Sequence, residues 1–132
     1  MKRVHDLEVQ AFSRQSNSQR YNYFVEKVFE WQEAWGLGDD EGWVIAEMGD
    51  IIVFPLWPAE PFAKQCQIDN WQNTEVKKIS FDELIQEILP SLANDNVQIA
   101  VFMVPENDQC GVLPAQELLN DFIMLNEQQE NK

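Results

Sequence analysis

The sequence has few of the residues on which most enzymes and metal sites depend. It contains one histidine, His5, and two cysteines, Cys66 and Cys110, with no Cys-x-x-Cys spacing. Histidine-assisted nucleophiles need an imidazole beside them, and zinc motifs need several ligands close in the sequence. Glycine-rich phosphate loops are absent as well. We therefore assign no catalytic residue and expect neither a metal nor a cofactor, while a disulfide between the two cysteines stays open.

Basic residues are scarce, and they are unevenly placed. The 132 residues include 9 Lys and Arg against 23 Asp and Glu, which gives a net charge of -14. Residues 1–35 hold five basic and five acidic side chains, whereas residues 36–132 hold four and eighteen. Direct nucleic-acid binding through phosphate neutralisation needs the opposite balance. All of the net charge lies after Trp35, and it favours a basic protein as partner.

Long apolar runs are missing too. The longest, residues 51–57 and 99–104, are much shorter than the roughly 20 residues that a membrane helix requires. Two basic residues near the start are followed by no apolar stretch, so they do not form a secretory signal. We expect a cytoplasmic protein without membrane contact.

The hydrophobic pattern predicts an α+β fold: a single compact domain with a mixed sheet of four to five strands and flanking helices. Helices come first, then a hairpin, then alternating strands and helices. Apolar spacing predicts a helix from about residue 19 to Trp35, capped by Ser18 and stopped by Gly36. A short helix over residues 6–12 precedes it. Residues 1–18 and 126–132 are expected to be loosely ordered.

Strand and helix signals alternate in the remainder of the chain. Strands are predicted at residues 43–47, 51–57, 75–79, 97–104 and 110–113. Helices are predicted at residues 58–67, at 81–92 and after Pro114. The helix at 81–92 has the clearest signal, because Ser80 and Glu83 form a capping box before it. Pro90 should end or bend that helix.

The most unusual stretch runs from Trp35 to Trp43 and places Asp39, Asp40 and Glu41 between glycines and tryptophans. One interpretation is a solvated acidic turn with both tryptophans in the core. The other is a binding surface, because tryptophan anchors interfaces and carboxylates hold the Lys or Arg of a partner. A metal site is disfavoured, since adjacent side chains rarely converge on one ion and the spacing of calcium loops is absent.

A second aromatic cluster surrounds Trp57, which lies among Pro55, Pro58 and Pro61. These prolines stiffen the exit from a predicted strand, and ligands of open α/β sheets favour the carboxyl ends of strands. Trp57 therefore either fills the core or lines a pocket. Trp71, in the polar stretch that follows, is expected to be partly exposed.

Several motifs taken together resemble one known family. They are FVEKV (24–28), EAWGL (33–37), DDEGW (39–43), PLWP (55–58), ISFDEL (79–84) and PAQELL (114–119). Over about residues 20–125 the chain resembles the bacterial domain-of-unknown-function family 2750. The resemblance implies a small bacterial cytosolic domain of mixed α and β structure. It implies no activity, so no site residue is carried over.

Three functional hypotheses follow. The first is a non-enzymatic acidic domain of the inhibitor, immunity or mimic type that binds a basic partner. Its hypothetical binding residues are Trp35, Asp39, Asp40, Glu41, Trp43, Trp57 and Trp71. The second is a small-ligand-binding or carboxylate-based enzyme domain with a pocket near Trp57 and Trp43. The third is a homodimer that forms through exposed aromatic side chains.

Overall fold

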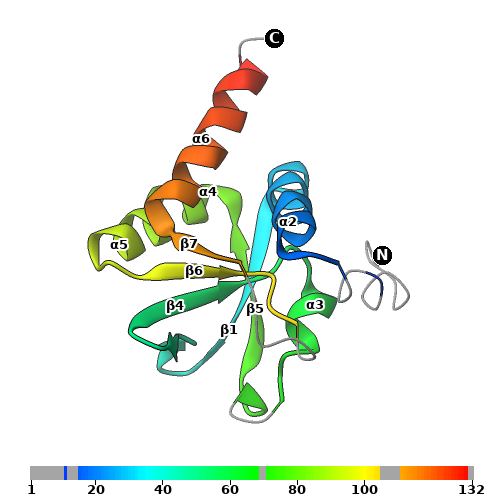
Figure 1. Cartoon of the computed structure of the whole chain (residues 1–132), viewed down its shortest axis with the longest axis vertical. Helices are drawn as coiled ribbons and strands as arrows, with labels where there is room; N and C mark the ends of the chain where they lie inside the picture. The colour runs from blue at the N-terminus through cyan, green and yellow to red at the C-terminus, as the bar shows by residue number, and fades with distance from the viewer. Residues whose placement is uncertain (1–10, 12–14, 69–70, 105–110, 131–132) are drawn as a thin grey trace.

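The computed structural model describes residues 11, 15–68, 71–104 and 111–130. It confirms an α+β domain in which helices pack on mixed β-sheet structure (Figure 1). His5, Cys110 and most of the helix predicted over residues 6–12 lie outside the described residues, as does the disulfide considered above.

The elements alternate along the chain much as the hydrophobic pattern predicts. The strands are β1 (Glu33–Asp39), β2 (Gly42–Trp43), β3 (Ala46–Met48), β4 (Ile51–Leu56), β5 (Glu75–Ser80), β6 (Gln98–Val101) and β7 (Gly111–Pro114). The helices are α2 (Asn17–Trp31), α3 (Glu60–Lys64), α4 (Phe81–Glu83), the π-helical segment η2 (Leu84–Ile88), α5 (Leu89–Asn94) and α6 (Ala115–Glu130).

The described strands form two sheets that meet at one backbone bridge. One sheet is antiparallel, in the order β2-β1-β5, and the other has the order β3-β4-β6-β7 with β4 and β6 parallel. Trp35 of β1 and Trp57, just after β4, exchange backbone hydrogen bonds of 2.9 and 2.8 Å. The sheet content therefore exceeds the four to five strands expected and is divided in two.

Strand β1 includes residues 33–35, which were predicted as the end of the helix from residue 19 to Trp35. Helix α2 ends at Trp31, and Gln32 turns the chain with a left-handed φ of 57°. Residues 33–38 then pair one by one with residues 80–75 of β5. The prediction that the helix continues to Trp35 is therefore wrong. Pairing with β5 along the whole strand stabilises these residues more than one further helical turn, which Gly36 would in any case disfavour.

Serine side chains cap the two long helical segments. Helix α2 begins two residues before the predicted start, because Ser16 and Gln19 form a reciprocal capping box and Ser18 is not the cap. Ser80 caps the next long helical segment as predicted: its Oγ accepts the Glu83 N–H at 3.2 Å. Both caps fix where a helix leaves the preceding chain.

Pro90 lies inside a continuous helical segment and does not end it. Before the proline the helix widens into η2, where the Leu89 N–H bonds to the Leu84 carbonyl five residues back. Pro90 then occupies the first turn of α5, where its missing N–H is tolerated. The π-helical turn thus absorbs the proline.

Strand β6 is shorter than the predicted residues 97–104. Phe102 has a φ of 58°, and its N–H bonds to the Leu56 carbonyl at 2.9 Å, so the strand ends at Val101. It still lies between β4 and β7 with its last three residues buried, as predicted for a central strand.

Helix α6 continues through residues 126–130. None of the described helices is long and apolar enough to cross a membrane.

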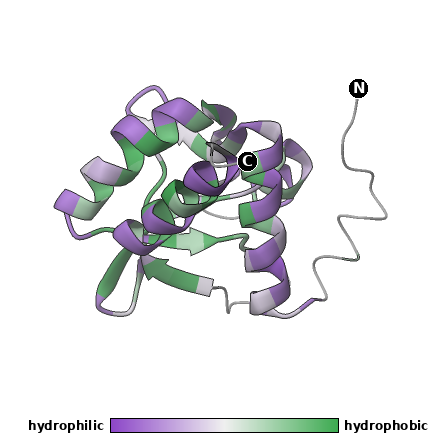
Figure 2. Ribbon diagram, turned by 90° about the horizontal axis from the view of Figure 1, so that it is seen from above, coloured by the Kyte–Doolittle hydropathy of each residue, from purple (hydrophilic) through white to green (hydrophobic). Residues whose placement is uncertain are grey.

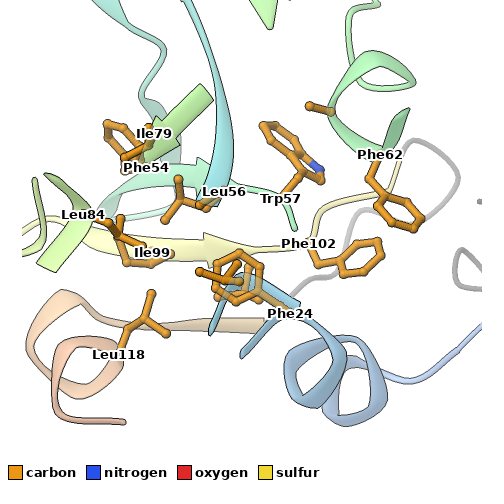
Figure 3. Packing of buried hydrophobic residues seen from close by; sticks show 14 of the residues in the cluster. Phe24, Phe54, Leu56, Trp57, Phe62, Ile79, Leu84, Ile99, Phe102 and Leu118 are labelled. Atoms are coloured by element: carbon orange, nitrogen blue, oxygen red, sulfur yellow. The ribbon is translucent and has the colours of Figure 1, made fainter. Parts of the chain in front are cut away.

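The hydrophobic core lies between the sheets and the helices and places α2 beside α6 (Figures 2 and 3). The rings of Phe24 in α2 and Phe122 in α6 are 6.3 Å apart between centroids, and both side chains are fully buried. Phe62 and Phe102 approach to 4.5 Å. Burying one large apolar side chain contributes about 1.5–3 kcal/mol, so these contacts fix both helices on the sheet.

Candidate functional site

The acidic segment singled out in the sequence forms the tip of the hairpin between β1 and β2. Asp39 pairs with Gly42, whose φ of 136° suits glycine in particular, and Asp39 Oδ1 accepts the Glu41 N–H at 2.8 Å. The side chains of Asp39, Asp40 and Glu41 are exposed. This hairpin, residues 39–43, therefore presents three carboxylates to solvent in a defined turn.

Trp43 and Lys77 stabilise the turn of the hairpin. Trp43 is half-buried, and its ring lies so close to Gly36 that a Cβ there would be 3.1 Å from Trp43 Cζ3. Lys77 Nζ lies 5.7 Å from the centre of the Trp43 ring and donates to the Asp39 carbonyl at 3.0 Å. The cation nearest the acidic tip thus holds the backbone of the turn in place.

The other predicted site tryptophans lie near the junction of the sheets. Trp57 is 0% exposed, and its Nε1–H donates to the Met103 carbonyl at 2.9 Å. Its ring meets Trp71 edge to face at 6.4 Å, and Trp35, which is half-buried, pairs with its backbone. The tryptophans do not line one exposed groove, because Trp57 is enclosed and reaches a ligand only if the core opens.

A groove that sequence reasoning missed lies between α2 and the second half of α6. Its volume is about 380 Å³. Apolar side chains from both helices form its floor: Val25, Phe29, Met124 and Leu125. Polar and acidic side chains also line it: Asn22, Glu26, Asp121 and Gln128. The part of α6 that contributes to the groove extends beyond the rest of the molecule in Figure 1.

Tyr21 joins the two walls of this groove. Its hydroxyl donates a hydrogen bond to Asp121 Oδ2, which links α2 to α6 across 100 positions of sequence. Burial raises the pKa of Tyr21 above its ordinary value, and the hydrogen bond to Asp121 and the charges of Asp121 and Glu117 raise it further. The phenol therefore stays protonated and keeps the hydrogen bond at physiological pH.

A second hollow, of about 370 Å³, lies between the start of α2 and strand β7. Tyr21 and Asn22 belong to both hollows, and Gly111 and Val112 of β7 line the far end. A Cβ on Gly111 would meet no atom of the described residues within 4 Å. We call the two hollows together the helix groove.

The sequence does contain a signal for the helix groove. Tyr21, Val25 and Phe29 recur at four-residue spacing beside the buried stripe of Phe24 and Val28, so the apolar arc of α2 is wider than the core requires. The excess arc is the surface that α6 leaves partly uncovered. What the sequence could not indicate is that α6, 100 residues away, forms the second wall.

Metal ligands do not converge in the parts of the chain that the structure describes. There, no group of three or more His, Cys, Asp or Glu side chains is placed to hold an ion. The carboxylates of the hairpin lie side by side along the turn and face solvent.

Fold and surfaces together describe a small α+β domain with an acidic hairpin and an acidic, apolar-floored groove. The sequence profile of the family described as protein of unknown function (DUF2750) matches residues 21–122. The chain therefore belongs to this family, as its motifs indicated. A search of curated proteins found no match to the chain.

Proposed function

We propose that this chain is a non-enzymatic, cytoplasmic interaction domain that binds a basic protein, in the manner of an inhibitor, immunity or mimic protein. The observation that supports this most is the hairpin at residues 39–43. It presents three exposed carboxylates beside a half-buried tryptophan, on a turn that hydrogen bonds hold in place. A basic side chain of a partner can pair with these carboxylates without reorganising the turn.

The charge around the hairpin supports the same proposal. The described residues include eighteen acidic and five basic residues. Of the basic ones, Arg20 is buried, Lys27 and Lys64 pair with neighbouring glutamates, and Lys77 lies against the hairpin. Few positive groups therefore offset the acidic surface. A field of one sign raises the association rate with a partner of opposite charge and repels acidic competitors.

The test is capture of partners from a cell lysate by the immobilised chain at two salt concentrations. At about 0.05 M salt the chain should retain proteins with basic isoelectric points, and at about 0.5 M it should release most of them, because exposed charges are screened. The variant Asp39→Asn/Asp40→Asn/Glu41→Gln should capture much less. It preserves the turn, because the amide oxygen introduced in place of Asp39 Oδ1 still accepts the N–H of residue 41.

A matched variant separates the hairpin from net charge. Glu47→Gln/Glu87→Gln/Asp95→Asn removes three exposed carboxylates from other elements, so it has the same net charge as the hairpin variant. It should capture nearly as much as the unchanged chain. Equal loss in both variants, or capture that persists at high salt, would contradict binding at the hairpin. Sedimentation as a dimer that survives both triple changes would favour the homodimer instead.

A further inference from the structure

We infer that the helix groove docks an amphipathic, positively charged helix of a partner protein. This inference does not depend on the hairpin, because the groove lies on α2, α6 and β7 and shares no lining residue with residues 39–43. It rests on three observations: the groove is elongated, its floor is apolar while its charged lining is acidic, and its two walls are tied together.

The shape of the groove suits a helix. Its two hollows, of about 380 and 370 Å³, share Tyr21 and Asn22 in their lining, and the α2 residues that line them run from Asn17 to Phe29. Twelve residues of helix rise about 18 Å, which is the length of about three turns of a docked helix. Lying in such a groove, a helix presents apolar side chains at three- and four-residue spacing, the arrangement of helix-in-groove recognition.

The floor of the groove offers apolar area that the fold itself does not cover. Met124 is 58% exposed although it is a large apolar side chain, and it lies next to Leu125 on the groove side of α6. Phe29 and Val25 face it from α2, each only partly buried. Methionine and aromatic side chains are enriched where proteins bind helices of varied sequence.

Charge identifies the kind of helix. The charged side chains that line the two hollows are Glu26 and Asp121, and no Lys or Arg lines either hollow among the described residues. Glu117 is close enough to raise the pKa of Tyr21 by its charge, so it adds to the negative potential. A helix with Lys or Arg beside its apolar stripe is complementary to this lining.

The same charges disfavour a second copy of this chain as the occupant. Helix α6, the segment that extends furthest and could enter the groove of another copy, has acidic and no basic residues. Each copy has a net charge of -14. Bringing these surfaces together places like charges in contact, which costs free energy.

The Tyr21–Asp121 hydrogen bond prepares the groove for binding. It connects α2 to α6 at Tyr21, which lines both hollows, so it fixes the distance between the two helices. A groove that is already formed loses less conformational entropy when a ligand enters, and affinity gains accordingly.

The test uses synthetic helical peptides and the full chain. The probe is a peptide of about 18 residues, or five turns, with leucine on one face and lysine on the others. Its control has glutamate in place of every lysine. Binding is measured by isothermal titration calorimetry at about 0.15 M salt, where exposed charges more than about 8 Å apart are screened. The lysine peptide should bind and the glutamate peptide should not.

Variants locate the binding. Met124→Asn removes a large apolar side chain from the groove without changing its charge, and Gly111→Gln narrows the end at β7; each should weaken binding about tenfold or more. Ile45→Asn is the matched control, because Ile45 is 56% exposed and lines neither hollow. Circular dichroism checks that all three variants remain folded.

The outcomes are distinct. Weaker binding in both groove variants, with Ile45→Asn unchanged, supports the inference. Absence of binding by the lysine peptide, equal binding by the glutamate peptide, or full affinity in Met124→Asn would overturn it. Sedimentation of the free chain as a dimer that Met124→Asn dissociates would also overturn it, since a second copy would then be the occupant. None of these results depends on whether the hairpin binds a partner.

Discussion

The hairpin at residues 39–43 and the helix groove are both acidic, but they are built differently. The hairpin presents Asp39, Asp40 and Glu41 to solvent at the end of two strands, whereas the groove places its charges around an apolar floor. Exposed charges act over about 8–10 Å and weaken as salt is added. Burial of apolar surface acts only on contact and is much less sensitive to salt. A partner held at the hairpin should therefore be released by added salt, whereas one held in the groove should be released much less.

The two regions also differ in how they keep their shape. The hairpin depends on close backbone approach at glycine, and the groove depends on side-chain contacts between helices that are distant in sequence. Stability measurements on matched variants can therefore test whether the two regions keep their shape by these different means.

The largest effect is expected at Gly38. A Cβ there would lie 2.8 Å from the Gly42 carbonyl oxygen, and backbone cannot move aside as a flexible side chain can. Gly38→Ala should therefore lower the free energy of unfolding by about 1–3 kcal/mol, the usual cost of overpacking. Urea denaturation measures it. The control is Gly111→Ala, whose Cβ meets no described atom within 4 Å. Equal effects in the two variants would show that the hairpin is not tightly packed.

A smaller effect is expected from the hydrogen bond across the groove. Tyr21→Phe removes only the hydroxyl that donates to Asp121, so it should cost about 1 kcal/mol of unfolding free energy for a partly exposed bond to a charged group. A double-mutant cycle with Asp121→Ala isolates the pair. If the two changes were simply additive, the bond would contribute nothing to holding α2 and α6 together.

The pH dependence of stability tests the same bond from another direction. The pKa of Tyr21 in the folded chain is raised above its ordinary value of 10.0, first by burial and then by the hydrogen bond to Asp121. The stability from the protonated phenol is therefore complete below that ordinary value and is lost as the pH rises above it. Unfolding measured across this range should show a loss in the unchanged chain that is smaller in Tyr21→Phe. Identical curves would contradict the raised pKa.

The smallest effect on stability is expected at the hairpin carboxylates. Asp39→Asn/Asp40→Asn/Glu41→Gln should change the free energy of unfolding by less than about 0.5 kcal/mol, because the three side chains are exposed and the turn keeps its hydrogen bond. Thermal denaturation compares the variant with Glu47→Gln/Glu87→Gln/Asp95→Asn. A large loss confined to the hairpin variant would mean that these carboxylates stabilise the fold, and the proposal that they serve binding would lose its support.

The parts of the fold that the sequence predicted are those where local signals and tertiary packing agree. The capped helix after Ser80, the buried strand before Phe102 and the α+β arrangement are of this kind. The end of α2 is of the other kind, since Trp35 fits a helical spacing as well as it fits a strand. Only the pairing with β5, more than forty positions away, decides between them.

The candidate site divides in the same way. The acidic turn could be found from the sequence because its residues are consecutive, although the strand β1 that makes it a hairpin was not predicted. The helix groove could not, because its walls come from the two ends of the chain and meet only in the fold. The one local sign of the groove is the wide apolar arc of α2, in which the partly buried Val25 lies beside the fully buried core positions.

The most direct test of the central claim is a binding footprint. The ¹⁵N-labelled full chain is titrated with the lysine-faced peptide at about 0.15 M salt, and the amide shifts are mapped by NMR. The largest changes should fall on residues 17–29 of α2 and 121–128 of α6, with little change at residues 39–43. Changes confined to the hairpin would contradict docking in the helix groove, because they would place the lysine-faced peptide on the exposed carboxylates alone.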